Sequence, residues 1–101
     1  MGLDENGDDR IDGGQGNDAI DTGAGFNYVF GGSGDDAITG GDDNNTLYGG
    51  DGIDTITGGR GNDYIEGGNG NDIIVATGGK NVLSGGLGDD NITASGNGDR
   101  V

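Results

Sequence analysis

The chain has 101 residues, 28 of them glycine, and it contains no proline, cysteine, histidine or tryptophan. Its 19 acidic and 4 basic residues give a formal net charge of −15 at pH 7, which argues against nucleic acid as a partner. No apolar run approaches the roughly 18 residues of a membrane-spanning helix, and the lack of cysteine excludes a disulfide framework. A hydrophobic content of only 28% is typical of disorder unless a repeat organises the chain.

A nine-residue repeat runs without insertion from Asp4 to the end of the chain, giving eleven units of which the last is one residue short. Position eight of the unit is always a branched aliphatic residue: Ile11, Ile20, Val29, Ile38, Leu47, Ile56, Ile65, Ile74, Leu83, Ile92 and Val101. Position six is always Asp or Asn: Asp9, Asp18, Asn27, Asp36, Asn45, Asp54, Asp63, Asp72, Asn81, Asp90 and Asp99. Disordered low-complexity chains do not keep such a phase, so the sequence predicts a folded repeat protein.

Each unit is predicted to form a tight turn of about six residues followed by a three-residue strand. In chain order, the strands of the ten complete units are expected at 10–12, 19–21, 28–30, 37–39, 46–48, 55–57, 64–66, 73–75, 82–84 and 91–93. Alternation along a strand points the aliphatic residue to one face and its neighbours to the other. Two units make one coil, and stacked coils form two parallel sheets that enclose the position-eight side chains. Residues 1–3 are expected to be a leader or a cloning remnant, and 4–101 one all-β domain.

The consensus Gly-Gly-x-Gly-x-Asp-x-aliphatic-x resembles the RTX (hemolysin-type) calcium-binding nonapeptide. Six units match all five specified positions: 13–21, 31–39, 49–57, 58–66, 67–75 and 85–93. The resemblance covers residues 4–101. It implies a parallel β-roll, a right-handed two-sheet solenoid, with Ca²⁺ held between turns that stack 18 residues apart. It also implies that the position-six carboxylates and backbone carbonyls of the glycine-rich turn are the ligands.

The chemistry of the residues favours the same metal. A core one side chain thick offers little hydrophobic stabilisation, and stacked columns of Asp repel one another, so a divalent cation would both cross-link the turns and remove the repulsion. Without histidine or cysteine, zinc, copper and iron–sulfur sites lack their usual ligands. Oxygen ligands on a flexible glycine turn suit Ca²⁺ better than Mg²⁺, which requires a stricter octahedral geometry.

Turns of alternate units lie on opposite edges of such a roll. The even units, counted with 4–12 as the first, all carry the complete motif and form the even edge. Their position-six residues are the main predicted ligands: Asp18, Asp36, Asp54, Asp72 and Asp90. The carbonyls implied as further ligands belong to the glycines at positions two and four: Gly14, Gly16, Gly32, Gly34, Gly50, Gly52, Gly68, Gly70, Gly86 and Gly88. Five stacked turns leave four gaps, which predicts about four strong calcium sites.

The odd units form the odd edge and depart from the consensus. Thr22 replaces the first glycine of the third unit, Asp43 the fourth-position glycine of the fifth, and Ala76 and Thr77 the opening glycines of the ninth. Every gap on this edge has at least one Asn at position six, and an Asn oxygen carries no charge. Calcium is therefore expected to be weak or absent here, with Asp9, Asp63 and Asp99 as the charged candidates.

The outward faces of the two sheets differ in character. Tyr28, Phe30, Tyr48 and Tyr64 occupy outward positions of the odd strands, which is typical of cross-strand packing on a solvated sheet. A docking face for a partner domain or for carbohydrate is the alternative. The opposite face carries Thr39, Thr55, Thr57 and Thr93, and an ice-binding array is disfavoured because Ile73 and Val75 interrupt it.

These observations predict a calcium-dependent folding module of a secreted bacterial protein. The resemblance implies export by type I secretion, with folding in extracellular calcium. The chain is expected to be a segment of a longer protein, so its partners would be calcium and flanking domains. A structural alternative is end-to-end stacking into a filament or an adhesin stalk. Catalysis is not expected, because the paired carboxylates recur at every turn and no unique group of residues breaks the pattern.

Overall fold

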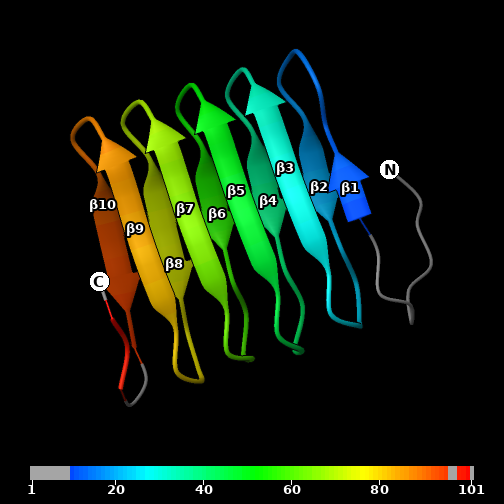
Figure 1. The fold of residues 1–101 in the computed structure, drawn as a ribbon, viewed down its shortest axis with the longest axis vertical. Helices are drawn as coiled ribbons and strands as arrows, with labels where there is room; N and C mark the ends of the chain where they lie inside the picture. Colours follow the sequence, from blue (N-terminus) through cyan, green and yellow to red (C-terminus); the bar gives the residue numbers. More distant parts are fainter. Residues whose placement is uncertain (1–9, 96–97, 101) are drawn as a thin grey trace.

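The computed structural model describes residues 10–95 and 98–100, so the expectations for residues 1–3, for Asp9 and for Val101 lie outside the described residues. Within that range the chain forms ten strands in two parallel sheets and no helix, as the repeat predicts (Figure 1). Sheet A contains the odd-unit strands β1 (Arg10–Asp12), β3 (Tyr28–Ser33), β5 (Thr46–Asp51), β7 (Tyr64–Asn69) and β9 (Val82–Leu87), in that order. Sheet B contains the even-unit strands β2 (Ala19–Asp21), β4 (Ala37–Thr39), β6 (Thr55–Thr57), β8 (Ile73–Ala76) and β10 (Asn91–Ala94).

The register between neighbouring strands equals two repeat units. Ile38 of β4 pairs with Ile56 of β6, and Ile56 pairs in turn with Ile74 of β8. In sheet A, Leu47 of β5 pairs with Ile65 of β7. Each partner lies 18 residues further along the chain, which confirms the predicted coil and places equivalent positions directly above one another.

The position-eight side chains lie between the sheets and form the core. Val29, Leu47, Ile56, Ile65 and Ile74 are completely buried, with an exposed fraction of 0%. Ile92 is partly buried against the same cluster. Ala76, at position one of the ninth unit, joins the core as well. The core is therefore one aliphatic row from each sheet, and the molecule is a slab with extents of 33 × 33 × 13 Å.

The strands of sheet A are longer than the repeat predicts. Strands β3, β5, β7 and β9 each run for six residues and include the first three positions of the following even unit. The cause is the Gly-Gly pair, because Gly32, Gly50, Gly68 and Gly86 stay in register from coil to coil. A Cβ on Gly32 would collide with the carbonyl oxygen of Gly14, so glycine is what lets these turns stack so closely.

The two rows of turns lie on opposite edges of the slab. In Figure 1 the even-unit turns, which follow the sheet A strands, lie along the upper edge, and the odd-unit turns lie along the lower edge. In the part of the chain that the structure describes, no helix is long and apolar enough to cross a membrane.

Candidate metal centres at the two edges

On the even edge, the position-six carboxylates from Asp36 onward each accept a hydrogen bond from the coil before them. Oδ1 of Asp36 accepts a hydrogen bond of 2.8 Å from the backbone N–H of Asp18, and Oδ1 of Asp54 accepts one of 2.8 Å from Asp36. The same bond joins Asp54 to Asp72 at 2.9 Å and Asp72 to Asp90 at 2.8 Å. The five predicted Asp residues therefore form one continuous column that ties all five even turns together.

The second carboxylate oxygen has no hydrogen-bond partner in most of this column. Oδ2 of Asp18, Asp36, Asp54 and Asp72 is buried without a partner. Three of these residues are almost completely buried, with exposed fractions of 2% for Asp36, 0% for Asp54 and 1% for Asp72. A buried carboxylate oxygen without a donor is costly, and a row of them one coil apart is a site that a cation would satisfy.

The space beside each of these oxygens exists because position one is glycine. A Cβ added to Gly31 would lie 2.7 Å from Oδ2 of Asp36 and 2.6 Å from the carbonyl oxygen of Gly49 in the next coil. Gly13 has the same relationship to Asp18 and Gly31. A carboxylate oxygen and a carbonyl oxygen thus border one small volume between consecutive coils. Hard oxygen donors of this kind fit Ca²⁺.

Burial also changes the acidity of these carboxyl groups. It raises the pKa of Asp36 and of Asp72 above the ordinary value and raises the pKa of Asp54 to about 6. The backbone N–H donors oppose the rise, and the carboxylates of neighbouring coils reinforce it. The column is therefore a place where negative charge is disfavoured without a counter-ion.

The predicted carbonyl ligands have the backbone conformation that the motif requires. All ten glycines at positions two and four of the even units have positive φ, between 84° and 119°. The carbonyl of Gly14 already accepts a hydrogen bond of 3.1 Å from the N–H of Ser33. The carbonyls at position one, such as that of Gly49, border the same space as the unpaired Oδ2 atoms, and the sequence prediction did not include them. Among the described residues no three acidic side chains converge, so a metal here would need such carbonyls.

The odd edge has the same ladder, meaning a series of hydrogen bonds from a backbone N–H to the position-six side chain of the next coil. Here the position-six residues are mainly Asn. Oδ1 of Asn45 accepts from the N–H of Asn27 at 3.0 Å, and Oδ1 of Asp63 accepts from Asn45 at 2.8 Å. The ladder continues through Asn81 and Asp99, each bond 2.7 Å long. Asp63 is buried, its Oδ2 has no partner, and burial raises its pKa to about 6. Of the predicted carboxylates on this edge, Asp63 is thus the one that repeats the buried, unpaired Oδ2 of the even edge within the described residues.

A second ladder at position five was missed by the sequence analysis. Oδ1 of Asn17 accepts from the N–H of Asp35, and Oδ1 of Asp35 accepts from the N–H of Ile53, both at 2.8 Å. These bonds run in the opposite direction to those of position six, since the acceptor belongs to the earlier coil. The odd edge has the same ladder from Asn44 through Asn62. The frequent Asn and Asp at position five was the signal that could have predicted it.

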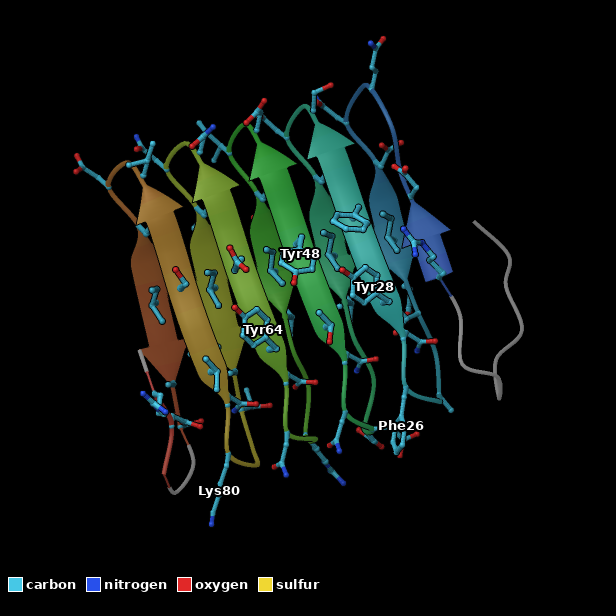
Figure 2. All side chains as sticks on the ribbon, in the orientation of Figure 1. Phe26, Tyr28, Tyr48, Tyr64 and Lys80 are labelled. Atoms are coloured by element: carbon cyan, nitrogen blue, oxygen red, sulfur yellow. The ribbon has the colours of Figure 1, made fainter. Side chains whose placement is uncertain are left out.

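The aromatic residues of sheet A pack on one another across the strands, as Figure 2 shows for the tyrosines on its outer face. Phe30 and Tyr48 are stacked with their ring centroids 5.0 Å apart, and Tyr28 meets Phe30 edge-on at 5.1 Å. The guanidinium carbon of Arg10 lies 5.4 Å from the Tyr28 ring centroid. These contacts are the cross-strand packing that the sequence predicts for this face.

Comparison with protein families shows which family the chain belongs to. The family model described as RTX calcium-binding nonapeptide repeat (4 copies) matches residues 4–29, 13–47, 21–56, 39–74, 48–83 and 66–101. The chain belongs to the RTX calcium-binding nonapeptide repeat family. No curated protein and no solved structure gives a significant match. Membership of this RTX family makes the chain a calcium-binding β-roll module, and the family is structural rather than catalytic.

Proposed function

We propose that this RTX roll is the calcium-dependent folding module of a secreted bacterial protein, disordered at low calcium and folded once calcium binds after export. The observation that carries the proposal is the row of buried, unpaired Oδ2 atoms on the even edge. Unsatisfied carboxylate oxygens and a formal charge of −15 both destabilise the folded chain in the absence of a counter-ion.

The proposed ligands are the carboxylates of Asp18, Asp36, Asp54, Asp72 and Asp90, together with carbonyls of the glycines in the same turns. About four ions would occupy the gaps between these five turns. Asp9, Asp63 and Asp99 are weaker candidates on the odd edge. Their charge is diluted there by Asn residues, and only Asp63 lies in a complete motif.

Calcium would act by differential binding to the folded chain. The turns bring the carboxylate of one coil beside the carbonyls of the next only when the coils are stacked, so the unfolded chain offers no equivalent site. Each ion then stabilises the roll by RT ln(1 + [Ca]/Kd), which is about 1.4 kcal/mol at ten times Kd. Several coupled sites of this size are enough to decide whether a thin-cored roll folds.

The proposed extracellular location follows from the same dependence of folding on calcium. Calcium is scarce inside bacterial cells and abundant outside them, so a module of this kind stays unfolded during export and folds in the extracellular medium. We assign the chain to the extracellular side on this basis and on the common type I secretion of RTX proteins.

Self-association is a second candidate function. Coils that share one register could continue from one molecule to the next by pairing of their end strands, as in an adhesin stalk or filament. Light scattering of the calcium-loaded protein separates the two: a monomer supports a folding module, and growth with protein concentration supports a filament.

The direct test of the proposed function is circular dichroism of the calcium-stripped chain during titration with CaCl₂ and, separately, with MgCl₂. The expected result is a cooperative change from coil to β with Ca²⁺ and no equivalent change with Mg²⁺ at the same concentration. A full β signal in excess chelator would overturn the proposal.

A further inference from the structure

We infer that Asn27, Asn45 and Asn81 replace calcium on the odd edge: their side-chain amides hold these turns closed without a metal. The inference rests on the proposed function, because it specifies where within the roll calcium is not needed. It starts from one difference between Asp and Asn. Both offer an Oδ1 acceptor to the ladder, but only Asn offers Nδ2, which carries two donors.

The Nδ2 donors are directed at the turn's own backbone. Nδ2 of Asn81 donates to the carbonyl oxygen of Gly78 at 2.8 Å, and Nδ2 of Asn45 donates to that of Asp43 at 2.9 Å. Nδ2 of Asn27 donates to the carbonyl of Gly25 at 3.2 Å and to that of Ala24 at 3.4 Å. These acceptors lie at positions three and four of the same unit. A turn carbonyl that accepts from the amide is turned toward a hydrogen-bond donor rather than toward a cation.

Other side chains on this edge donate or accept in the same way. The hydroxyl of Thr77 donates to the carbonyl of Gly59 at 3.2 Å, where the even edge has a glycine without a side chain. Asp43 replaces the fourth-position glycine, and its Oδ2 accepts from the N–H of Gly25 at 2.8 Å. The departures from the consensus therefore add hydrogen bonds between and within the odd turns.

In two of these turns, the side chain at position one also occupies the space that a metal would need. On the even edge a Cβ at this position would lie within 3 Å of the unpaired Oδ2, as at Gly31 and Gly67. On the odd edge Thr22 and Ala76 carry that Cβ, and their exposed fractions are 1% and 0%. The two substitutions accompany Asn27 and Asn81 in the same units. A side chain thus fills the space that the even edge leaves open, and the residue beside it is neutral.

Two columns of different chemistry therefore make up one roll. The even column is charged and has unpaired oxygens, whereas the odd column is largely neutral and satisfied by its own amides. Calcium is needed to close the even turns, and the Asn turns close by themselves as the coils stack. The odd edge accordingly limits the calcium demand of the roll without weakening the ladder that both edges share.

The test is Asn81→Asp, with Asp54→Asn on the even edge as the matched control. Asn81→Asp keeps the shape and Oδ1 but loses both donors and adds a carboxylate to a turn whose position one is Ala76. It should raise the calcium midpoint for folding by about twofold and leave the number of bound ions at saturation unchanged. Asp54→Asn should reduce the number of bound ions. If calcium instead binds at Asn81, the added carboxylate improves the site, and a lowered midpoint overturns the inference.

A measurement on the unmodified chain keeps the inference testable if Asn81→Asp does not fold. Exchange of the side-chain amide protons is followed by NMR in saturating CaCl₂. Asn45 and Asn81 should be protected relative to the exposed Asn44 and Asn62. Free exchange at Asn45 and Asn81 would overturn the inference. A chain that is folded without calcium and binds none would refute the proposed function, and amide protection would still decide the role of the Asn residues.

Discussion

The backbone N–H of Asp54 donates a hydrogen bond of 2.9 Å to Oδ1 of Asp72, which lies one coil further along the roll. The same bond recurs at every described step of both edges, whether the acceptor is Asp or Asn. The ladder itself therefore does not distinguish the two edges. The difference lies in the other terminal atom of the side chain, which is an unpaired Oδ2 on the even edge and an amide Nδ2 in the Asn turns of the odd edge.

The position-eight row should tolerate no charge. Ile56 is completely buried between Ile38 and Ile74 of the neighbouring strands. Ile56→Asp would place a carboxylate between the sheets without a partner, so we expect a loss of about 4 kcal/mol or more and no β signal at any calcium concentration. Thr57→Asp, one residue further and on the outer face, should cost about 1 kcal/mol. Equal damage in both variants, measured by circular dichroism in CaCl₂, would contradict the register.

Glycine at position one of the even units should be required because it leaves space for the metal, and not because the backbone there has a positive φ angle. Gly31→Ala would place a methyl group 2.7 Å from Oδ2 of Asp36 and 2.6 Å from the carbonyl oxygen of Gly49, so calorimetry should show fewer calcium ions bound at saturation. Gly78→Ala, at position three of an odd turn, is the control, because the atoms nearest to its Cβ are backbone atoms of Arg60, at 3.1 Å or more. Unchanged calcium binding by Gly31→Ala would show that the metal does not use this space.

The position-five ladder can be completed by one substitution. Ile53 is 51% exposed and has no side-chain oxygen, so the ladder from Asn17 through Asp35 stops there and begins again at Asn71. Ile53→Asn would offer an acceptor to the N–H of Asn71 and should stabilise the calcium-loaded roll by about 1 kcal/mol. Comparing the thermal unfolding of Ile53→Asn with that of Ile53→Ala separates the effect of the added acceptor from the effect of losing the isoleucine side chain. A variant no more stable than Ile53→Ala would mean that the ladder contributes nothing.

Acidification should have opposite effects on the metal-free and calcium-loaded chains. The pKa of Asp54 and that of Asp63 are raised by burial from 3.8 to about 6, so the folded metal-free chain binds protons more tightly than the unfolded chain. This stabilisation is fully present below about pH 4 and is lost as the pH rises through about 6. The β signal without calcium should therefore increase between pH 7 and pH 4.

Calcium binding has the reverse dependence, because protons compete with the metal for the same carboxylates. The calcium midpoint for folding should therefore rise as the pH falls from 7 to 5. Circular dichroism at a series of pH values, with and without calcium, checks the direction of both effects. A metal-free chain that loses β signal on acidification would contradict the assignment of a raised pKa to these groups.

Much of this architecture was predictable because the repeat constrains it so strongly. The aliphatic at position eight and the 18-residue register follow from the phase of the sequence alone, and the buried row from Ile11 to Leu83 confirms them. The predicted Asp residues of the even edge do form one column. Their roles as calcium ligands remain predictions, and so do those of the glycine carbonyls.

Other features depend on atoms that the pattern does not resolve. The six-residue length of β3 arises from the pairing of Gly32 with Gly50, whereas the same glycines predict only a turn when taken singly. The Nδ2 bonds of Asn45 and Asn81 depend on side-chain rotamers. The sequence indicated that these Asn residues weaken a metal site, but not that they bond to the turn themselves.

Diffraction from crystals grown in CaCl₂, with anomalous data that locate calcium, tests the central claim most directly. We predict strong calcium peaks between consecutive even turns, beside Oδ2 of Asp18, Asp36, Asp54 and Asp72. At the turns of Asn27, Asn45 and Asn81 we predict no peak and a retained bond from Nδ2 to the turn carbonyl. Peaks of equal strength on both edges, or none on the even edge, would contradict the account.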